Sequence, residues 1–167
     1  MTLTFWGTRG SIPVSGAPYT RYGGNTTCIS VEYDDLVIII DTGSGARPCG
    51  GHYFNTEKPI LMLWTHMHWD HIQGFPFFAP IFDANRTISL YSPSGVTHLD
   101  HLFSQCDGIH FPLKPVHIPA TFNRLESLSE IKQRYGVSIE SIEVNHPGEC
   151  YGFKLQTESD SMVFIPD

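Results

Sequence analysis

Residues 66–71 read His-Met-His-Trp-Asp-His and directly follow an apolar stretch. In an extended chain, residues two apart point to the same side, so His66 and His68 can both face one ion. If the chain then turns, Asp70 and His71 can point into the same pocket toward a second ion. Imidazole nitrogen and carboxylate oxygen suit zinc, manganese and iron, so the stretch predicts a catalytic metal site at the end of a strand.

The segments around this motif predict a layered α/β protein. Strands are expected where β-branched and aromatic residues gather, at 3–6, 27–33, 36–40, 60–64, 87–91, 137–144, 151–156 and 162–165. Helices fit residues 95–106 and 125–135, and an Asp-Asp pair at 34–35 predicts a hairpin turn. No repeat, low-complexity tract or linker divides the sequence, which predicts one domain over residues 1–167.

Composition narrows the classes of function. The 167 residues are 41% hydrophobic, as expected for one globular domain. Ten Lys and Arg against 17 Asp and Glu give a net charge of −7, which predicts no strong binding of nucleic acid. No apolar run approaches the roughly 20 residues of a membrane helix, and the first residues lack the features of a signal peptide. We therefore expect a cytoplasmic protein with no membrane partner.

The cysteines and the other histidines carry weaker signals. The four cysteines form no C-x-x-C pair, so buried free thiols are expected in place of disulfides or a cysteine zinc site. His98 and His101, three apart on an expected helix, are interpreted as solvated side chains. His52 and His117 lack a partner pattern and are assigned to the surface, whereas His110 lies in a loop that could reach over a pocket.

Beyond the motif, the sequence resembles the metallo-β-lactamase fold family, in the branch of phosphoribosyl cyclic phosphodiesterase and, more distantly, ribonuclease Z. The stretches that carry the resemblance are Phe-Trp-Gly-Thr-Arg-Gly-Ser-Ile-Pro at 5–13, Tyr-Gly-Gly-Asn-Thr at 22–26, Asp-Thr-Gly-Ser-Gly at 41–45, and residues 65–78. The likeness extends over residues 3–167. The histidine motif is highly specific for the fold and only weakly specific for the substrate.

The resemblance implies a centre for two divalent metal ions, with zinc first and manganese or iron as alternatives. It assigns His146 as the next metal histidine and Asp167 as a carboxylate that bridges both ions. By this assignment one ion is held by His66, His68, His146 and Asp167, and the other by Asp70, His71 and Asp167. Asp41 matches a strand-end acid that supports the metal loop through hydrogen bonds without binding metal.

The chain ends where members of this branch continue with further strands, helices and a last metal histidine. The resemblance therefore implies an αββα sandwich that lacks the C-terminal part of its second half, with a second metal set short by one ligand. A fragment of a larger enzyme, a shortened inactive product and a half-domain completed by another chain all fit this pattern. The uncovered apolar strand near 162–165 predicts association, as in a homo-oligomer.

A centre filled with two ions predicts a metal-dependent hydrolase. Ions about 3.5 to 4 Å apart can hold a bridging hydroxide and polarise the oxygens of a phosphodiester. Asp70 is the candidate catalytic residue, which would orient that hydroxide. We therefore expect a phosphodiesterase for a cyclic or other small phosphodiester, with the loops at Arg9 and Asn25 as candidates for substrate contact.

Three alternatives stay open beside this expectation. A thioester or lactone hydrolase would use the same ligand set. A metal-binding or interaction module without catalysis would account for the absent last ligand. A role in transfer-RNA processing is disfavoured, because the sequence has no Gly-rich basic arm and its net charge opposes binding of a large polyanion.

Overall fold

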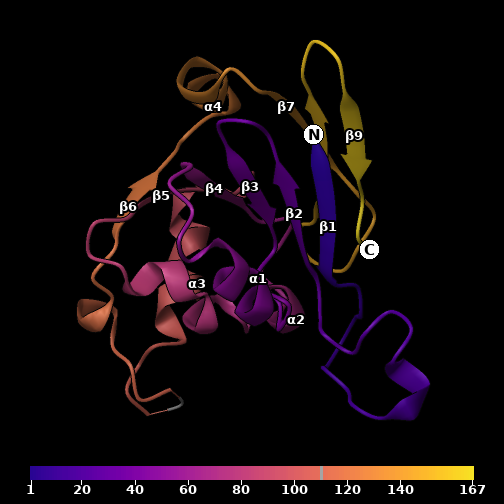
Figure 1. Cartoon of the computed structure of the whole chain (residues 1–167), viewed down its shortest axis with the longest axis vertical. Helices are drawn as coiled ribbons and strands as arrows, with labels where there is room; N and C mark the ends of the chain where they lie inside the picture. Colours follow the sequence, from indigo (N-terminus) through magenta and orange to yellow (C-terminus); the bar gives the residue numbers. More distant parts are fainter. Residues whose placement is uncertain (110) are drawn as a thin grey trace.

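Two β-sheets stack face to face, with the helices between residues 46 and 104 on the outer face of the larger one (Figure 1). The computed structural model describes residues 1–109 and 111–167. The six-stranded sheet has the order β1-β2-β3-β4-β5-β6, antiparallel from β1 to β3 and parallel from β3 to β6. Its strands are β1 Thr2–Gly7, β2 Cys28–Glu32, β3 Val37–Ile40, β4 Ile60–Leu63, β5 Thr87–Tyr91 and β6 Thr121–Arg124.

The second sheet is antiparallel and has three strands in the order β7-β8-β9. Its strands are β7 Ser138–Glu143, β8 Tyr151–Gln156 and β9 Ser161–Phe164. The helices are α1 Ala46–Tyr53, α2 Trp69–Ile72, α3 Asp100–Ser104 and α4 Leu128–Tyr135. Single 3-10 turns are η1 Ala17–Tyr19, η2 Phe75–Phe77, η3 Ala79–Phe82, η4 Val96–Leu99 and η5 Pro115–His117.

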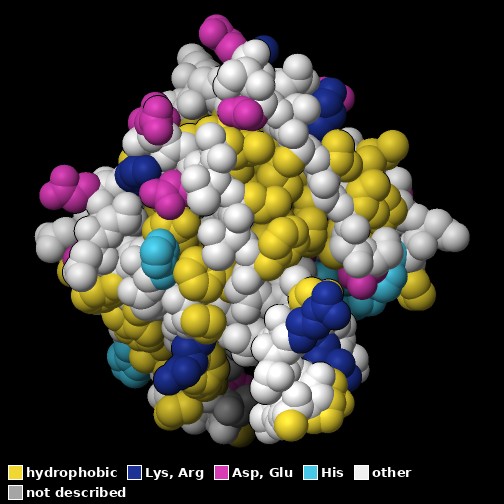
Figure 2. Space-filling view, turned by 45° about the vertical axis from the view of Figure 1, so that its right-hand side comes forward, with side chains coloured by type: hydrophobic (Ala, Val, Ile, Leu, Met, Phe, Trp, Pro, Cys, Tyr) yellow, Lys and Arg dark blue, Asp and Glu magenta, His cyan; other side chains and the backbone are white. Residues whose placement is uncertain are grey.

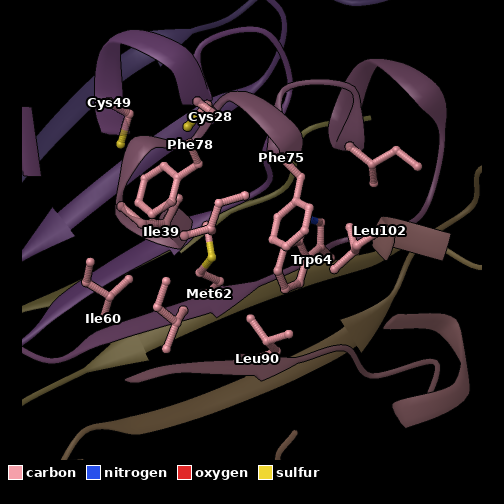
Figure 3. Packing of buried hydrophobic residues seen from close by; sticks show 14 of the residues in the cluster. Cys28, Ile39, Cys49, Ile60, Met62, Trp64, Phe75, Phe78, Leu90 and Leu102 are labelled. Carbon is pink, nitrogen blue, oxygen red and sulfur yellow. The ribbon is translucent and has the colours of Figure 1, made fainter. Parts of the chain in front are cut away.

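The central strands are buried on both faces, which is why they read as continuous apolar runs. On β3, Ile39 faces the helix layer and packs in one cluster with Met62, Phe78 and Cys49 (Figure 3). Its neighbour Ile38 faces the other way. That second cluster lies between the two sheets and also includes Ile29, Leu61, Ile139, Phe153 and Leu155. The strand ends of the larger sheet are thus held rigidly between two apolar layers.

Several expectations from the sequence are confirmed. Tyr33 N donates to Leu36 O at 2.8 Å, which closes the hairpin turn expected at 34–35. The expected strands are present within a residue or two of their predicted ends, and the four cysteines are buried and free. Among the described residues, no helix has the length and the apolar character that crossing a membrane requires.

The expectations for two helices need correction, and two elements were not foreseen. The helix expected at 95–106 is a 3-10 turn followed by the short α3, and the helix expected from 125 begins at 128. Ser127 sets that later start, because its hydroxyl accepts a hydrogen bond from Glu130 N. Helix α1 and strand β6 were not expected. The α1 sequence contains Pro48 and Gly50, yet Gly50 fits there because a side chain would meet Ala79 N at 2.5 Å.

Large hydrophobic side chains are exposed on β1, on the outer face of the smaller sheet and after β9. They include Leu3, Phe5, Ile142, Val163 and Ile165. Figure 2 brings the side of β1 and β9 forward and shows hydrophobic side chains gathered over it. Exposed hydrophobic patches can mark contact surfaces in proteins, and association through this face stays a prediction.

Candidate metal centre

The histidine motif lies where β4 ends and the chain turns into α2. Thr65 and His66 follow the buried strand, and His68 has an extended ψ of 150° as the residue before α2. Asp70 and His71 then lie on the first turns of that short helix. The turn expected after His68 is therefore where the sequence analysis placed it, and it brings both halves of the motif to one side.

A buried carboxylate fixes this loop from below. Asp41 follows β3 directly and is fully buried with a φ of 58°, a backbone conformation that Asp tolerates better than most residues. Its Oδ1 accepts a hydrogen bond from Thr65 N, and its Oδ2 accepts from Thr65 Oγ1, both at 2.8 Å. The same Oδ2 lies 2.8 Å from His71 Nδ1. One side chain thus anchors both ends of the motif.

The contact with Asp41 also sets which nitrogen of His71 faces the centre. Burial acts to lower the pKa of His71, but the hydrogen bond and the charge of Asp41 outweigh it and raise the pKa above its usual value. With Nδ1 donating to Asp41, Nε2 is directed toward the centre. There it lies 3.1 Å from Asp167 Oδ2 and 3.7 Å from Asp70 Oδ2.

The two ring nitrogens of His66 have different surroundings. Its Nδ1 is held by Thr65 Oγ1 at 3.0 Å and lies 3.5 Å from Cys150 Sγ. Its Nε2 is buried and has no hydrogen-bond partner among the described residues. Burial, together with the nearby His71, His68 and His146, lowers the pKa of His66 to about 3. A neutral imidazole with an unpaired buried nitrogen is suited to bind a metal ion.

The smaller sheet delivers two further side chains to this point. His146 lies in the loop between β7 and β8, and Asp167 follows β9. Tyr151 N donates to Thr65 O at 3.0 Å, which ties the start of β8 to the motif loop. His146 Nε2 consequently lies 3.0 Å from His68 Nδ1, and Asp167 Oδ2 lies 3.8 Å from His66 Nε2.

Two groups of side chains have ligand atoms within 4.8 Å of one another. They are His66 with His68 and His146, and His66 with His71 and Asp167. Asp70 lies beside the second group but outside it, and its Oδ2 accepts a hydrogen bond from Ser11 N at 2.7 Å. The six residues assigned as ligands from the resemblance therefore converge at one place, and their donor set fits divalent metal ions.

Sequence reasoning missed three residues that shape the centre. Thr65 bridges Asp41 and His66, and its position directly before the motif is the signal that could have found it. Cys150 packs against His66, and burial with nearby carboxylates raises its pKa to about 11, so the thiol stays protonated. Ser11 reaches Asp70 across 59 positions in the sequence, and no local pattern predicts that contact.

The other histidines lie elsewhere. His52 packs against Trp6 and Tyr53, and His98 lies 4.0 Å from Glu149. His117 Nδ1 accepts from the backbone at Lys114, and His101 is exposed on α3. His110 lies outside the described residues.

Comparison with known proteins finds a family model that matches part of the chain and curated relatives of similar sequence. Residues 21–90 match the family model of the metallo-beta-lactamase superfamily. Ribonuclease Z of Haloarcula marismortui is 27% identical over 161 residues, which is 95% of this chain and 48% of the relative. Ribonuclease Z of Lachnospira eligens is 29% identical over 154 residues, 89% of this chain and 46% of the relative. The chain thus spans about half the length of the curated relatives it matches.

Solved structures share the fold at low sequence identity. Human tRNase Z, short form, superimposes with a TM-score of 0.65 at 14% identity, over 98% of this chain and 68% of that one. The metallo-beta-lactamase fold protein YhfI from Bacillus subtilis superimposes with a TM-score of 0.64 at 17% identity, over 96% of this chain and 60% of that one. A diphosphatase from the PhnP family superimposes with a TM-score of 0.62 at 18% identity, over 92% of this chain and 61% of that one. The fold expected from the sequence is confirmed.

Removal of one imidazole tests the first group. We expect His68→Ala to lower the zinc bound per folded chain by one ion, because that group then has two side chains left. Elemental analysis after gel filtration measures this, with the exposed His101→Ala as the matched control that leaves zinc content unchanged. Equal zinc content in His68→Ala and the unsubstituted chain would contradict the assignment.

The pKa of His66 predicts a pH response of the metal-free protein. In the unfolded chain this ring takes up a proton near pH 6.5, but in the folded chain only near pH 3. The folded state is therefore penalised as pH falls from about 6.5 toward 3. In an NMR titration the His66 ring should still be neutral at about pH 5, and a midpoint near 6.5 would show that the ring is not buried as described.

Proposed function

We propose that this chain, which has the metallo-β-lactamase fold and carries the superfamily domain over residues 21–90, is a metal-dependent hydrolase of phosphodiesters. The observation that carries the proposal is the convergence of three histidines and Asp167 on His66, whose buried Nε2 has no hydrogen-bond partner among the described residues. Two bound divalent ions, with zinc first and manganese or iron as alternatives, would supply Lewis acidity and lower the pKa of water there.

The chain's own residues divide the work of such a site. Asp41 holds His71 in one tautomer and orientation, and Thr65 does the same for His66. This fixed arrangement means that the ligands need little rearrangement when ions bind, which favours affinity. Asp167 lies between His66 and His71, where a carboxylate can serve both groups.

We assign Asp70 the positioning of the attacking water. Its Oδ2 lies beside His71 Nε2 and is held from the other side by Ser11 N. A carboxylate oxygen aimed by one backbone N–H keeps a second lone pair for a water molecule. Asp70 would then accept a proton from that water as the water oxygen bonds to phosphorus, and the P–O bond on the opposite side would break to release the ester alkoxide.

The names of the relatives favour phosphate esters over thioesters and lactones as substrates of this chain. The curated relatives are named ribonuclease Z, and one structural neighbour is a diphosphatase of the PhnP family. A cyclic or other small phosphodiester is the substrate expected from the sequence. A module that binds metal without catalysis is the alternative that the sequence left open.

Substitution of Asp70 tests the proposed chemistry. We expect the zinc-loaded chain to hydrolyse bis(p-nitrophenyl) phosphate and Asp70→Asn to lower kcat about 10²- to 10⁴-fold, the range of a lost general base. Asp34→Asn, in the β2–β3 turn, is the matched control with unchanged kcat.

The comparison substrate is a chromogenic thioester measured under the same conditions. Faster turnover of the thioester would contradict the phosphodiesterase proposal. No turnover of either substrate with zinc bound would favour the binding module. Unchanged kcat in Asp70→Asn would remove Asp70 from the chemistry.

A further inference from the structure

A lobe formed by residues 8–23 projects from the body of the molecule beside the metal centre (Figure 1). It contains a hollow of about 390 Å³ lined by two arginines and two tyrosines, Arg9, Arg21, Tyr19 and Tyr22. Gly10 lines the same hollow, and a side-chain carbon at Gly10 would lie 4.0 Å from Asp70 Oδ2. One wall of the hollow therefore lies close to the residue that we assign to the chemistry.

The charge of this lobe is opposite to that of the chain as a whole. Arg9 and Arg21 are the only charged side chains among residues 1–31, whereas the whole chain carries −7. In Figure 2, Lys and Arg side chains gather on the lower right lobe, close to histidine side chains at the right edge of the view. An anion would thus meet a local positive potential here despite the acidic composition.

Each arginine is stacked on a tyrosine ring. The guanidinium carbon of Arg9 lies 5.2 Å from the centre of the Tyr19 ring, and that of Arg21 lies 4.9 Å from the Tyr22 ring. Stacking orients the guanidinium planes and leaves edge N–H groups to donate to an anion. Tyr22 is 74% exposed and so presents a large aromatic surface to solvent.

The base of the lobe is fixed to the body of the protein. Arg9 N donates to Asn25 O at 3.1 Å, and Val14 N donates to Gly24 O at 2.9 Å. Gly24 permits this closeness, because a side chain there would lie 1.8 Å from Val14 O. Ser11 takes a φ of 75° and aims its N–H at Asp70. The side chain of Asn25 has a structural role as well, because its Nδ2 donates to Trp6 O at 3.4 Å, and the hollow keeps its place relative to the centre.

We propose that this hollow binds a nucleotide unit of the substrate, with phosphate on Arg9 and Arg21 and a base stacked on Tyr22. Guanidinium donors for phosphate and an exposed ring for a base are the two elements of single-strand recognition. The inference rests on the proposed function and specifies its substrate class as a short single-stranded nucleic acid, bound at one end beside Asp70. It revises the expectation, drawn from net charge, that nucleic acid is not a partner.

Binding to the metal-free chain separates this proposal from catalysis. The probe is a fluorescein-labelled deoxyadenylate hexamer, and the readout is fluorescence anisotropy after treatment with a chelator, so that no cleavage occurs. Contact with two phosphates predicts that the logarithm of the association constant falls with the logarithm of the salt concentration at a slope of about −1.4. Arg21→Gln should reduce the slope by about 0.7, and Tyr22→Ala should weaken binding about 5- to 100-fold.

Two controls make the result specific to the lobe. Tyr22→Phe keeps the ring and should bind as the unsubstituted chain does, and Lys132→Gln, on the distant α4, should change neither affinity nor slope. All of the substituted side chains are exposed, so thermal midpoints should stay unchanged. A hexamer of sugar-phosphate without bases should bind equally well to Tyr22→Ala and to the unsubstituted chain.

Absence of hexamer binding, or equal losses in Arg21→Gln and Lys132→Gln, would overturn the nucleotide site. Neither outcome bears on turnover of bis(p-nitrophenyl) phosphate, which tests the hydrolase proposal alone. If the hexamer binds and the chromogenic diester is not turned over, the site stands and the hydrolase proposal fails.

Discussion

The buried carboxylate of Asp41 is the constraint on which the candidate centre depends. Burial of an ionised group is costly unless hydrogen bonds compensate, and Asp41 accepts bonds from the backbone and side chain of Thr65 and contacts His71. These contacts join the ends of β3 and β4, two adjacent parallel strands of the larger sheet. The histidine loop is therefore positioned by the rigid core beneath it.

The smaller sheet contributes the remaining side chains of the candidate metal centre. Packing of Ile139, Phe153 and Leu155 between the sheets places the β7–β8 loop and the residues after β9 above the motif. His146 and Asp167 reach the centre for that reason, although they are about 75 to 100 positions away in sequence. The core thus positions the strand ends, and the strand ends position the converging polar side chains.

The sequence predicted the parts of this structure that local patterns encode. Buried β3 and β4 read as apolar runs, and the histidine motif signalled metal chemistry by its own spacing. Helix α1 escaped prediction because Gly50 is dictated by close packing on Phe78 and Ala79, which is a tertiary effect. Asp167 could be assigned only by resemblance, since nothing local distinguishes it. The basic lobe was hidden because a net charge averages over the chain, whereas binding responds to local charge.

Anomalous diffraction from crystals of the zinc-loaded chain tests the central claim most directly, because it locates the ions without reference to activity. The claim is that the Asp41-anchored loop and the second sheet together form a centre for two ions. It predicts two anomalous peaks, one among His66, His68 and His146 and one beside His71, Asp70 and Asp167. Peaks confined to other histidines, or none within reach of His66 Nε2, would contradict it.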